Sequence, residues 1–196
     1  TGIIFGASSK KIKSYLEIGN LLHVNYSSKS PERNGSFKIE ISRANTAFFF
    51  ENKIKLNCIV STLNLIKILT AENQSNKDLY NLINIFFENI KSDKWLKEYI
   101  LWELQLYKVL GFNLNLKDLV QKEEQNGTTN YFVISNNEKK IIPSFLVNEK
   151  ADDQDISKDD LFDAIKILNN FLEKSILRPS NIHFPQERLN FLSNLN

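Results

Sequence analysis

The sequence contains few residues of the kinds that build disulfide-linked, metal-binding or membrane-spanning proteins. Its 196 residues include one cysteine, two histidines and no methionine. A single cysteine excludes an internal disulfide and a cysteine-based metal site within one chain, and we expect Cys58 to be a small apolar residue of a helix. Apolar runs are interrupted by Lys, Asn and Glu, and no signal-peptide pattern opens the chain. We therefore expect a cytoplasmic protein without a membrane partner.

Signatures of catalysis and phosphate binding are also missing. The segment GASSKK, residues 6–11, superficially resembles a phosphate loop, but the G-x-x-x-x-G-K-[ST] spacing is absent and no convincing helix follows. The chain has no nucleophile elbow and no HExxH motif. His23 and His183 belong to no visible Ser-His-Asp constellation. We expect no enzymatic activity, no metal and no cofactor.

Two acidic features have structural interpretations. The run from Ala151 to Asp160 holds five aspartates, but it lacks the turn glycine and the terminal Glu of a calcium loop. We interpret Ser157 as a helix N-cap with Asp160 at the third helical position. Glu103 lies on an otherwise apolar helix face, where a partnered structural carboxylate is favoured over a catalytic one.

The strongest helical pattern runs from Lys94 to Phe112. Apolar side chains cover most of this helix and leave a narrow polar stripe, which is typical of a core helix enclosed by its neighbours. Gly111 follows the last periodic leucine and is expected to close the helix in the left-handed conformation. Helical spacing predicts further helices over residues 54–69, over residues 79–90, over residues 161–176 with a stop before Pro179, and from Pro185 onward.

The first fifty residues have the period of strands. Ser36 to Ser42 alternates apolar and polar residues and predicts a half-buried antiparallel strand. Residues 22–26 alternate in the same way and predict its partner across the long hairpin loop SSKSPERNG. Gly2 to Ala7 predicts the tail of another strand, so we expect further chain upstream of Thr1.

These patterns predict an α+β protein with two parts. Residues 1–51 form a β-domain and residues 52–196 form an all-α helical domain. Helical periodicity is lost from about residue 113 to residue 150. We expect a small irregular insertion there, in which Tyr131 to Ile134 could form a strand.

Positive charge is concentrated in the β-region. The whole chain has a net charge of +2, but its first 55 residues contain nine Lys or Arg against four acids. Lys10, Lys11 and Lys13 are expected on one loop between strands, where ammonium groups can meet phosphates without being buried. Lys38 projects from the polar face of a strand, and Arg43 lies just beyond that strand's end. These five residues are the candidate nucleic-acid contacts.

Two segments carry motifs whose order and spacing hold across nearly the entire chain. One is GIIFGASSKKIKSYLEIGNLL followed by GSFKIEI, and the other is YILWELQLYKVLGFNLNLKDL followed by a later helix and FPQERLNFL. Both resemble the bacterial RecO family of recombinational repair proteins. The matching positions are Gly2, Gly6, Ala7, Ser9, Lys10, Lys11 and Lys13, then Gly19, Asn20 and Leu21, then Glu103, Leu104, Leu106, Leu110, Gly111 and Phe112.

The resemblance implies a fold. It predicts an N-terminal OB-fold, here without its first strand and part of its second, followed by the helical domain. Many members of the family carry a cysteine-rich zinc module after the LGF step. This chain has no cysteine there and therefore resembles the zinc-free branch.

The resemblance also implies a function. It predicts a non-enzymatic, nucleoid-associated mediator that binds single- and double-stranded DNA and anneals complementary strands coated by single-strand-binding protein (SSB). With RecR, such a protein helps RecA replace SSB. The helical domain would offer an apolar groove to the SSB tail, and Lys10, Lys11 and Lys13 would be the main DNA contacts, with Lys38 and Arg43 as additions.

Two other classes stay open on the residues alone. The first is a protein-interaction scaffold whose helices bind a partner and whose β-region is merely structural. Such a scaffold would not be retained on heparin or single-stranded DNA resin at low salt. The second is a hydrolase that uses the Asp-rich run, which would show turnover dependent on a divalent cation.

Overall fold

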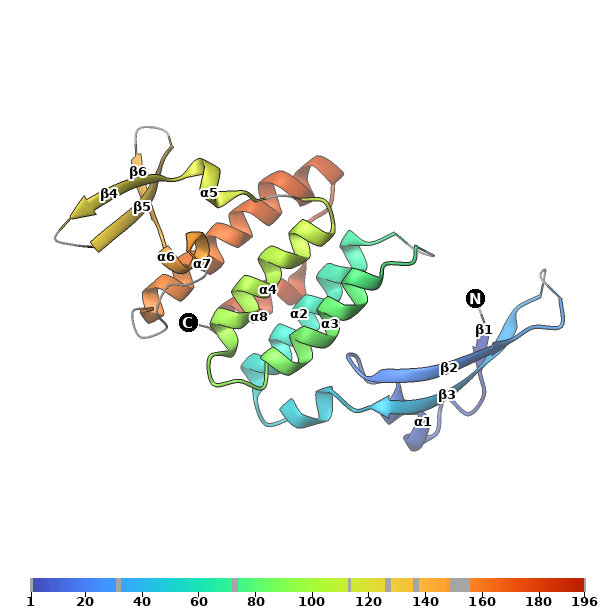
Figure 1. Ribbon diagram of the computed structural model, residues 1–196. Coiled ribbons are helices and arrows are strands. Elements are labelled where there is room, and N and C mark those ends of the chain that lie inside the picture. Colours follow the sequence, from blue (N-terminus) through green and yellow to red (C-terminus); the bar gives the residue numbers. More distant parts are fainter. Residues whose placement is uncertain are drawn as a thin grey trace. The chain divides into compact units, whose positions relative to one another are not determined.

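The computed structural model describes residues 2–30, 33–71, 74–112, 114–125, 128–135, 138–148 and 156–195. Over these residues the chain is a mixed α and β protein with eight α-helices and two three-stranded sheets (Figure 1). It divides into two compact units. One comprises Thr1–Ala71 together with Pro185–Asn196, and the other comprises Glu72–Phe184. The functional boundary expected after residue 51 stays a prediction.

The first unit opens with a sheet of strand order β1-β3-β2. β1 (Gly2–Ile4) runs parallel to β3 (Gly35–Arg43), and β2 (Leu21–Ser27) runs antiparallel to β3. The two strands predicted from alternating residues are confirmed, and β1 confirms a further strand near the start of the chain.

The register of β2 on β3 places the apolar residues of both strands on one face. Val24 is paired with Ile39, and Tyr26 is paired with Phe37. Ile39 is buried, but Val24 and Tyr26 are exposed. The apolar face of this sheet is thus only partly covered.

The helices of the first unit follow the sheet. A 3₁₀ turn, η1 (Thr46–Phe49), leads to α2 (Lys53–Leu69), where the Asn52 side chain accepts the Lys55 N–H at 3.1 Å as an N-cap. α2 packs against α8 (Gln186–Ser193). Cys58 is fully buried in α2, as expected of a small apolar residue.

The second unit is built around α4 (Trp95–Val109), which packs against α3 (Lys77–Asn89) and α7 (Lys158–Phe171). The Trp102 indole donates to the Leu82 carbonyl at 2.7 Å, so its polar group is satisfied in the core. The predicted core helix is confirmed.

The end of α4 also follows the sequence prediction. Gly111 has a φ of 85°, which an L side chain rarely adopts, and the next amide, of Phe112, donates back to the Tyr107 carbonyl at 2.7 Å. One turn earlier, the Tyr107 hydroxyl donates to the buried Glu103 carboxylate. Glu103 is therefore a partnered structural carboxylate, as predicted.

The expectation of an irregular insertion was wrong. The segment contains a short helix α5 (Leu116–Leu119), an antiparallel sheet of strands β4 (Gln121–Gln125), β5 (Thr128–Ser135) and β6 (Glu138–Ile142), and a short helix α6 (Ser144–Val147). β5 contains the predicted strand from Tyr131 to Ile134, a run of aromatic and β-branched residues that is typical of a strand. The outer strands are largely charged, so they lack the apolar pattern that would have revealed them.

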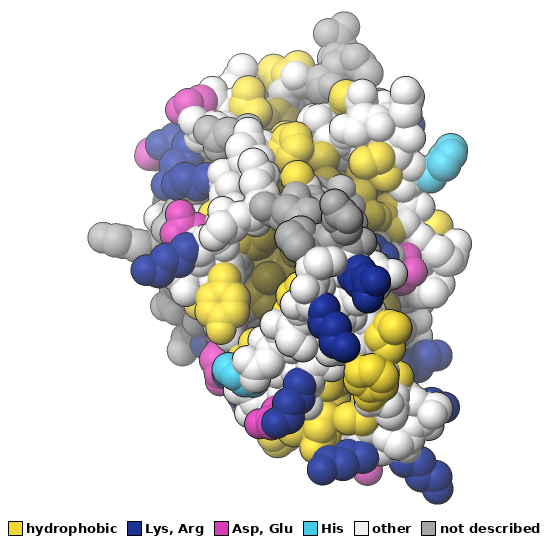
Figure 2. Space-filling model, turned by 90° about the vertical axis from the view of Figure 1, so that its right-hand side faces the viewer, with side chains coloured by type: hydrophobic (Ala, Val, Ile, Leu, Met, Phe, Trp, Pro, Cys, Tyr) yellow, Lys and Arg dark blue, Asp and Glu magenta, His cyan; other side chains and the backbone are white. Residues whose placement is uncertain are grey.

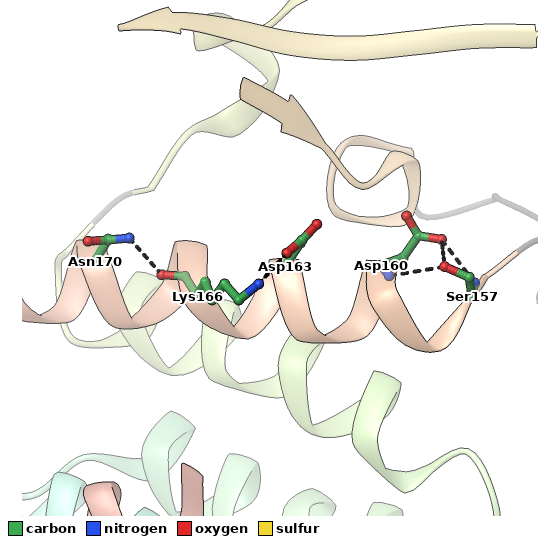
Figure 3. Close-up of polar contacts among 5 residues, drawn as sticks. All are labelled: Ser157, Asp160, Asp163, Lys166 and Asn170. Atoms are coloured by element: carbon green, nitrogen blue, oxygen red, sulfur yellow. Dashed lines mark hydrogen bonds and ion pairs between the residues drawn. The ribbon is translucent and has the colours of Figure 1, made fainter. Parts of the chain in front are cut away.

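The N-terminus of α7 confirms the capping prediction (Figure 3). The Ser157 hydroxyl accepts the Asp160 N–H at 3.1 Å, and the Asp160 carboxylate accepts the Ser157 N–H at 2.9 Å. Further along α7, the Lys166 ammonium lies 2.8 Å from the Asp163 carboxylate, and the Asn170 amide donates to the Lys166 carbonyl. The remaining aspartates of the run, Asp152, Asp153 and Asp155, lie outside the described residues.

Beyond α7 the chain stays helical but changes pitch. A π-helical stretch, η3 (Leu172–Leu177), is followed by a 3₁₀ turn, η4 (Arg178–Ser180), that contains Pro179. The predicted stop before Pro179 is confirmed for the α-helical and π-helical part, which ends at Leu177. Among the described residues, no helix combines the length and the apolar character needed to cross a membrane.

Candidate nucleic-acid interface

Lys10, Lys11 and Lys13 lie on a helix rather than on the loop that the sequence predicted. α1 (Lys10–Tyr15) follows a turn at Gly6, whose φ is 72°. The Ser9 amide donates to the Gly6 carbonyl at 2.9 Å, and the Ser9 hydroxyl caps the helix by accepting the Ile12 N–H at 3.3 Å. The GASSKK segment thus does lead into a helix, contrary to the prediction.

Helix geometry explains how α1 displays its lysines. At about 100° per residue, Ile12 lies opposite Lys10, with Lys11 and Lys13 to either side. Ile12 is half-buried and lines a groove with Phe37 of β3, whereas all three lysines are exposed. The ammonium groups consequently share the solvent side of one short helix, and Lys11 also lies over the Tyr15 ring at 5.9 Å.

Three polar side chains hold the segment after α1 in place by hydrogen bonds. The Asn20 amide donates to the Ser14 carbonyl at 3.0 Å and closes the end of the helix. The buried Asn45 amide donates to the Gly19 carbonyl at 3.0 Å, and the buried Thr46 hydroxyl donates to the Ile18 carbonyl. The chain on either side of β2 and β3 is therefore fixed by hydrogen bonds from buried groups.

The structure places Lys38 and Arg43 differently. Lys38 is an exposed residue of β3 whose ammonium lies 3.5 Å from the Glu40 carboxylate, a weak surface pair. It lines the same groove as Ile12 of α1. Arg43 is half-buried at the end of β3, about 17 Å along the strand from Lys38 at the usual rise per residue. Lys38 therefore lies at a groove that Ile12 of α1 also lines, whereas Arg43 is not among the described residues that line this groove, and none of the three α1 lysines lines it.

Two further cations flank this region, and the sequence reasoning did not select them. Lys29 and Arg33 are exposed residues of the connection between β2 and β3. They line a groove of about 400 Å³ together with Phe5 and Ile3. The signal was present in the basic hairpin loop SSKSPERNG, which was interpreted only as a turn.

The groove of Lys29 and Arg33 adjoins the groove of Ile12 and Lys38. The second groove has a volume of about 370 Å³, and Phe5, Ser27 and Ser36 line both. The face in Figure 2 shows Lys and Arg side chains bordering exposed hydrophobic side chains in its lower half. In the two grooves, the cations Lys29, Arg33 and Lys38 lie together with apolar side chains.

Metal chemistry has no support in the described part of the chain. No group of three or more His, Cys, Asp or Glu side chains there could hold a metal ion. His23 is exposed on β2, as predicted for a surface residue.

The fold and the site define a class: an α+β protein in which a small β-unit carries a cationic surface and a helical body surrounds a buried aromatic helix. Comparison with known proteins gives the family. Residues 54–193 match the family described as Recombination protein O C terminal. The chain belongs to the RecO family.

Curated relatives agree with this family. The DNA repair protein RecO of Rickettsia canadensis is 26% identical over 86% of this chain and 73% of its own length. The DNA repair protein RecO of Rickettsia akari is 24% identical over 94% of this chain and 81% of its own. The DNA repair protein RecO of a Wolbachia of Drosophila simulans is 34% identical over 51% of this chain and 42% of its own. No solved structure gives a significant match.

Proposed function

We propose that this DNA repair protein is a mediator that binds single- and double-stranded DNA and anneals complementary strands coated by SSB. With RecR it helps to load RecA onto SSB-coated single strands. It performs no covalent chemistry and uses no cofactor, and it works in the cytoplasm at the nucleoid. Its membership of the RecO family supports this role.

The observation that carries the DNA-binding part is the display of Lys10, Lys11 and Lys13 on the solvent side of the capped helix α1. Three exposed ammonium groups within one and a half turns offer contacts to successive phosphates. Such contacts fix a strand in place without reading its bases. A repair mediator needs this property because it must act at any sequence.

We propose that β1, β2 and β3 belong to an OB-fold. An OB-fold is a five-stranded, partly open Greek-key barrel whose face binds oligonucleotides. The mixed sheet β1-β3-β2, with its one parallel pair and a helix between β1 and β2, is compatible with three strands of such a barrel. The half-covered apolar face of the sheet also agrees with this assignment.

A place for the SSB tail is proposed in the second unit. A groove of about 440 Å³ on α3 and α4 is lined mainly by apolar side chains, among them Leu82, Leu101 and Trp102. Ile85, which is half-exposed, lies at this groove. A peptide with apolar residues would cover this surface on binding.

The decisive experiment changes Lys10, Lys11 and Lys13 together to Glu. We expect most of the DNA affinity to be lost, while circular dichroism and thermal unfolding stay unchanged because the three side chains are exposed. In the unchanged protein, log affinity should fall steeply with log salt concentration, since each phosphate contact releases counterions. An unchanged affinity and salt slope in the variant would refute the site. Annealing of SSB-coated strands then tests the mediator role.

The α3–α4 groove also supports a second candidate, a helical protein-interaction scaffold without direct DNA binding. Retention on single-stranded DNA resin at low salt separates the two. The scaffold would flow through, whereas the mediator would be retained and eluted by salt.

A further inference from the structure

The helix that carries the three candidate lysines is too short to be stable by itself. α1 has six residues, and isolated helices shorter than about 12 residues are marginal in water. All six residues are described, and none of them is buried, so the core does not enclose this helix. The Ser9 hydroxyl caps its first turn. Hydrogen bonds at its two ends are therefore important for keeping α1 ordered.

Asn20 supplies the hydrogen bonds at the C-terminal end of α1. Its side-chain amide donates to the Ser14 carbonyl at 3.0 Å and, more weakly, to the Tyr15 carbonyl at 3.4 Å. Both belong to the last four carbonyls of the helix, which have no partner within a helix. The side-chain oxygen of Asn20 is buried and has no hydrogen-bond partner among the described residues. The Asn20 side chain thus serves α1 through its N–H donors.

The segment that follows β3 fixes Asn20 in turn. The buried Asn45 amide donates to the Gly19 carbonyl at 3.0 Å, and the buried Thr46 hydroxyl donates to the Ile18 carbonyl. Gly19 has a φ of 92°, which an L side chain rarely adopts, and it directs the chain from the end of α1 into β2. Hydrogen bonds consequently run from two buried side chains, through residues 18–20, to the end of α1.

We propose that Asn20 is a positioning residue for DNA binding, whose amide keeps α1 in the conformation that displays its three lysines together. This inference rests on the proposed DNA binding and adds what sets its strength. Ammonium groups on an ordered helix lose little conformational entropy when they meet phosphates. Without the hydrogen bonds of Asn20 the same charges remain, but α1 is helical for a smaller fraction of the time. The affinity falls in proportion to that fraction.

The test measures binding of an oligothymidylate to the 196-residue chain by fluorescence anisotropy at several salt concentrations. We expect Asn20→Ala to weaken binding by roughly three- to tenfold, because hydrogen bonds that hold the binding conformation are lost. The slope of log affinity against log salt concentration should stay the same, because the same lysines still meet phosphates in the complex. Loss of the lysines themselves should instead make that slope shallower.

Hydrogen exchange of single amides, followed by NMR, reports whether α1 has loosened. The Lys13 amide donates to the Ser9 carbonyl, and the Leu16 amide donates to the Ile12 carbonyl. Both amides should exchange faster in Asn20→Ala, whereas amides at the centre of α2 should exchange at their former rate. A change confined to α1 is the result that general destabilisation would not give.

Asn52 provides the matched control. Its side chain caps α2 by accepting the Lys55 N–H at 3.1 Å, so Asn52→Ala also removes a hydrogen bond at a helix end of the same unit. This variant should lose comparable stability and keep its DNA affinity. A rescue variant adds Ser14→Ala to Asn20→Ala. Ser14 is exposed, and alanine favours a helix more than serine does, so about a twofold gain in affinity should return.

The outcomes separate this inference from the proposed function. If the unchanged protein does not bind at low salt, or if changing the three α1 lysines to Gln leaves binding intact, the proposed site and the role of Asn20 both fail. If the lysine variant loses affinity and Asn20→Ala does not, only the role of Asn20 is refuted. That role is also refuted if Asn52→Ala weakens binding equally, or if Asn20→Ala makes the salt slope shallower, since contacts to DNA would then have been lost.

Discussion

The chain contains two small sheets of equal strand number, and lysines lie on or beside both of them. In the insertion, Lys139 is paired with the Glu123 carboxylate and lies 4.1 Å over the Phe132 ring, and Lys122 lies 5.8 Å over the Tyr131 ring. In the first unit, Lys38 pairs with Glu40 and Lys11 lies over the Tyr15 ring, whereas Lys10 and Lys13 project from α1 into solvent. A neighbouring carboxylate competes with a phosphate for the ammonium group, so we expect Lys10 and Lys13 to be stronger phosphate contacts than Lys38 or Lys139. Lysine content alone therefore does not locate an interface.

The overall balance of charge follows the same division. Strands β4, β5 and β6 contain three lysines and three glutamates. The first 55 residues of the chain contain more than twice as many basic as acidic residues. The charges of the insertion sheet therefore balance, whereas the first sheet lies in a part of the sequence with an excess of positive charge.

The sharpest test of this comparison uses matched triple variants. The first variant changes Lys10, Lys11 and Lys13 to Gln. Its affinity for single strands should fall strongly, and the slope of log affinity against log salt concentration should become shallower by about two, because each lost phosphate contact removes about 0.7. The second variant changes Lys122, Lys139 and Lys140 to Gln and so removes the same charge from the second sheet. It should leave the affinity and the salt slope nearly unchanged. Equal losses in the two variants would mean that only total charge matters. Titrations across a range of salt concentrations provide the measurement.

A second prediction concerns what the insertion sheet does contribute. Ile142 of β6 is 4% exposed, whereas its neighbour Ile141 is 70% exposed. Ile142→Ala should lower the free energy of unfolding by about 2–5 kcal/mol because it leaves a cavity in the core. Ile141→Ala should change it by no more than about 0.5 kcal/mol. Urea unfolding, monitored by circular dichroism, measures the free energy of unfolding of both variants. If Ile142→Ala lowers it as little as Ile141→Ala does, Ile142 does not anchor the sheet.

A third prediction ranks the two outlying cations of the first sheet. Lys38→Gln should weaken DNA binding a few-fold and reduce the salt slope by about one, since this side chain is exposed beside the α1 groove. Arg43→Gln should have no such effect, because Arg43 is half-buried at the far end of β3. Comparable losses at both positions would extend the interface along the whole strand. Thermal unfolding of the Arg43 variant excludes a trivial loss of structure.

The smallest effect is expected at Lys139. Its ion pair with Glu123 and its contact with Phe132 both lie at the surface, where solvent screens them. Lys139→Ala should therefore cost no more than about 1 kcal/mol of stability and should not alter DNA binding. A double-mutant cycle with Glu123→Ala measures the interaction energy of the pair. A coupling energy well above about 1 kcal/mol would show that the pair is shielded from solvent.

Much of the helical body was predictable because its signals are local. The apolar spacing of α2, α3 and α4, the positive φ of Gly111 and the Ser157–Asp160 capping box all follow from residues a few positions apart. The alternation in β2 and β3 predicted their pairing for the same reason.

The features that were missed depend on tertiary contacts. α1 has only six residues, and it gains its place from the Ser9 cap and from Ile12 lying at the groove beside β3. β4 and β6 are highly charged edge strands that are recognisable only once β5 lies between them. Five cations were selected from the sequence. Of these, Lys38 lines a groove and Arg43 does not, and the structure adds the exposed Lys29 and Arg33, which line the adjoining groove.

The independent closure of α4 and α7 has a practical consequence. Gly111 ends one helix with its own backbone turn, and Ser157 begins the other with its own capping box, so neither terminus borrows hydrogen bonds from the sheet between them. Both of these helix ends are therefore stabilised by residues within a few positions of the terminus. Ile141, which is 70% exposed on β6, is a suitable position in the insertion at which to attach a fluorophore.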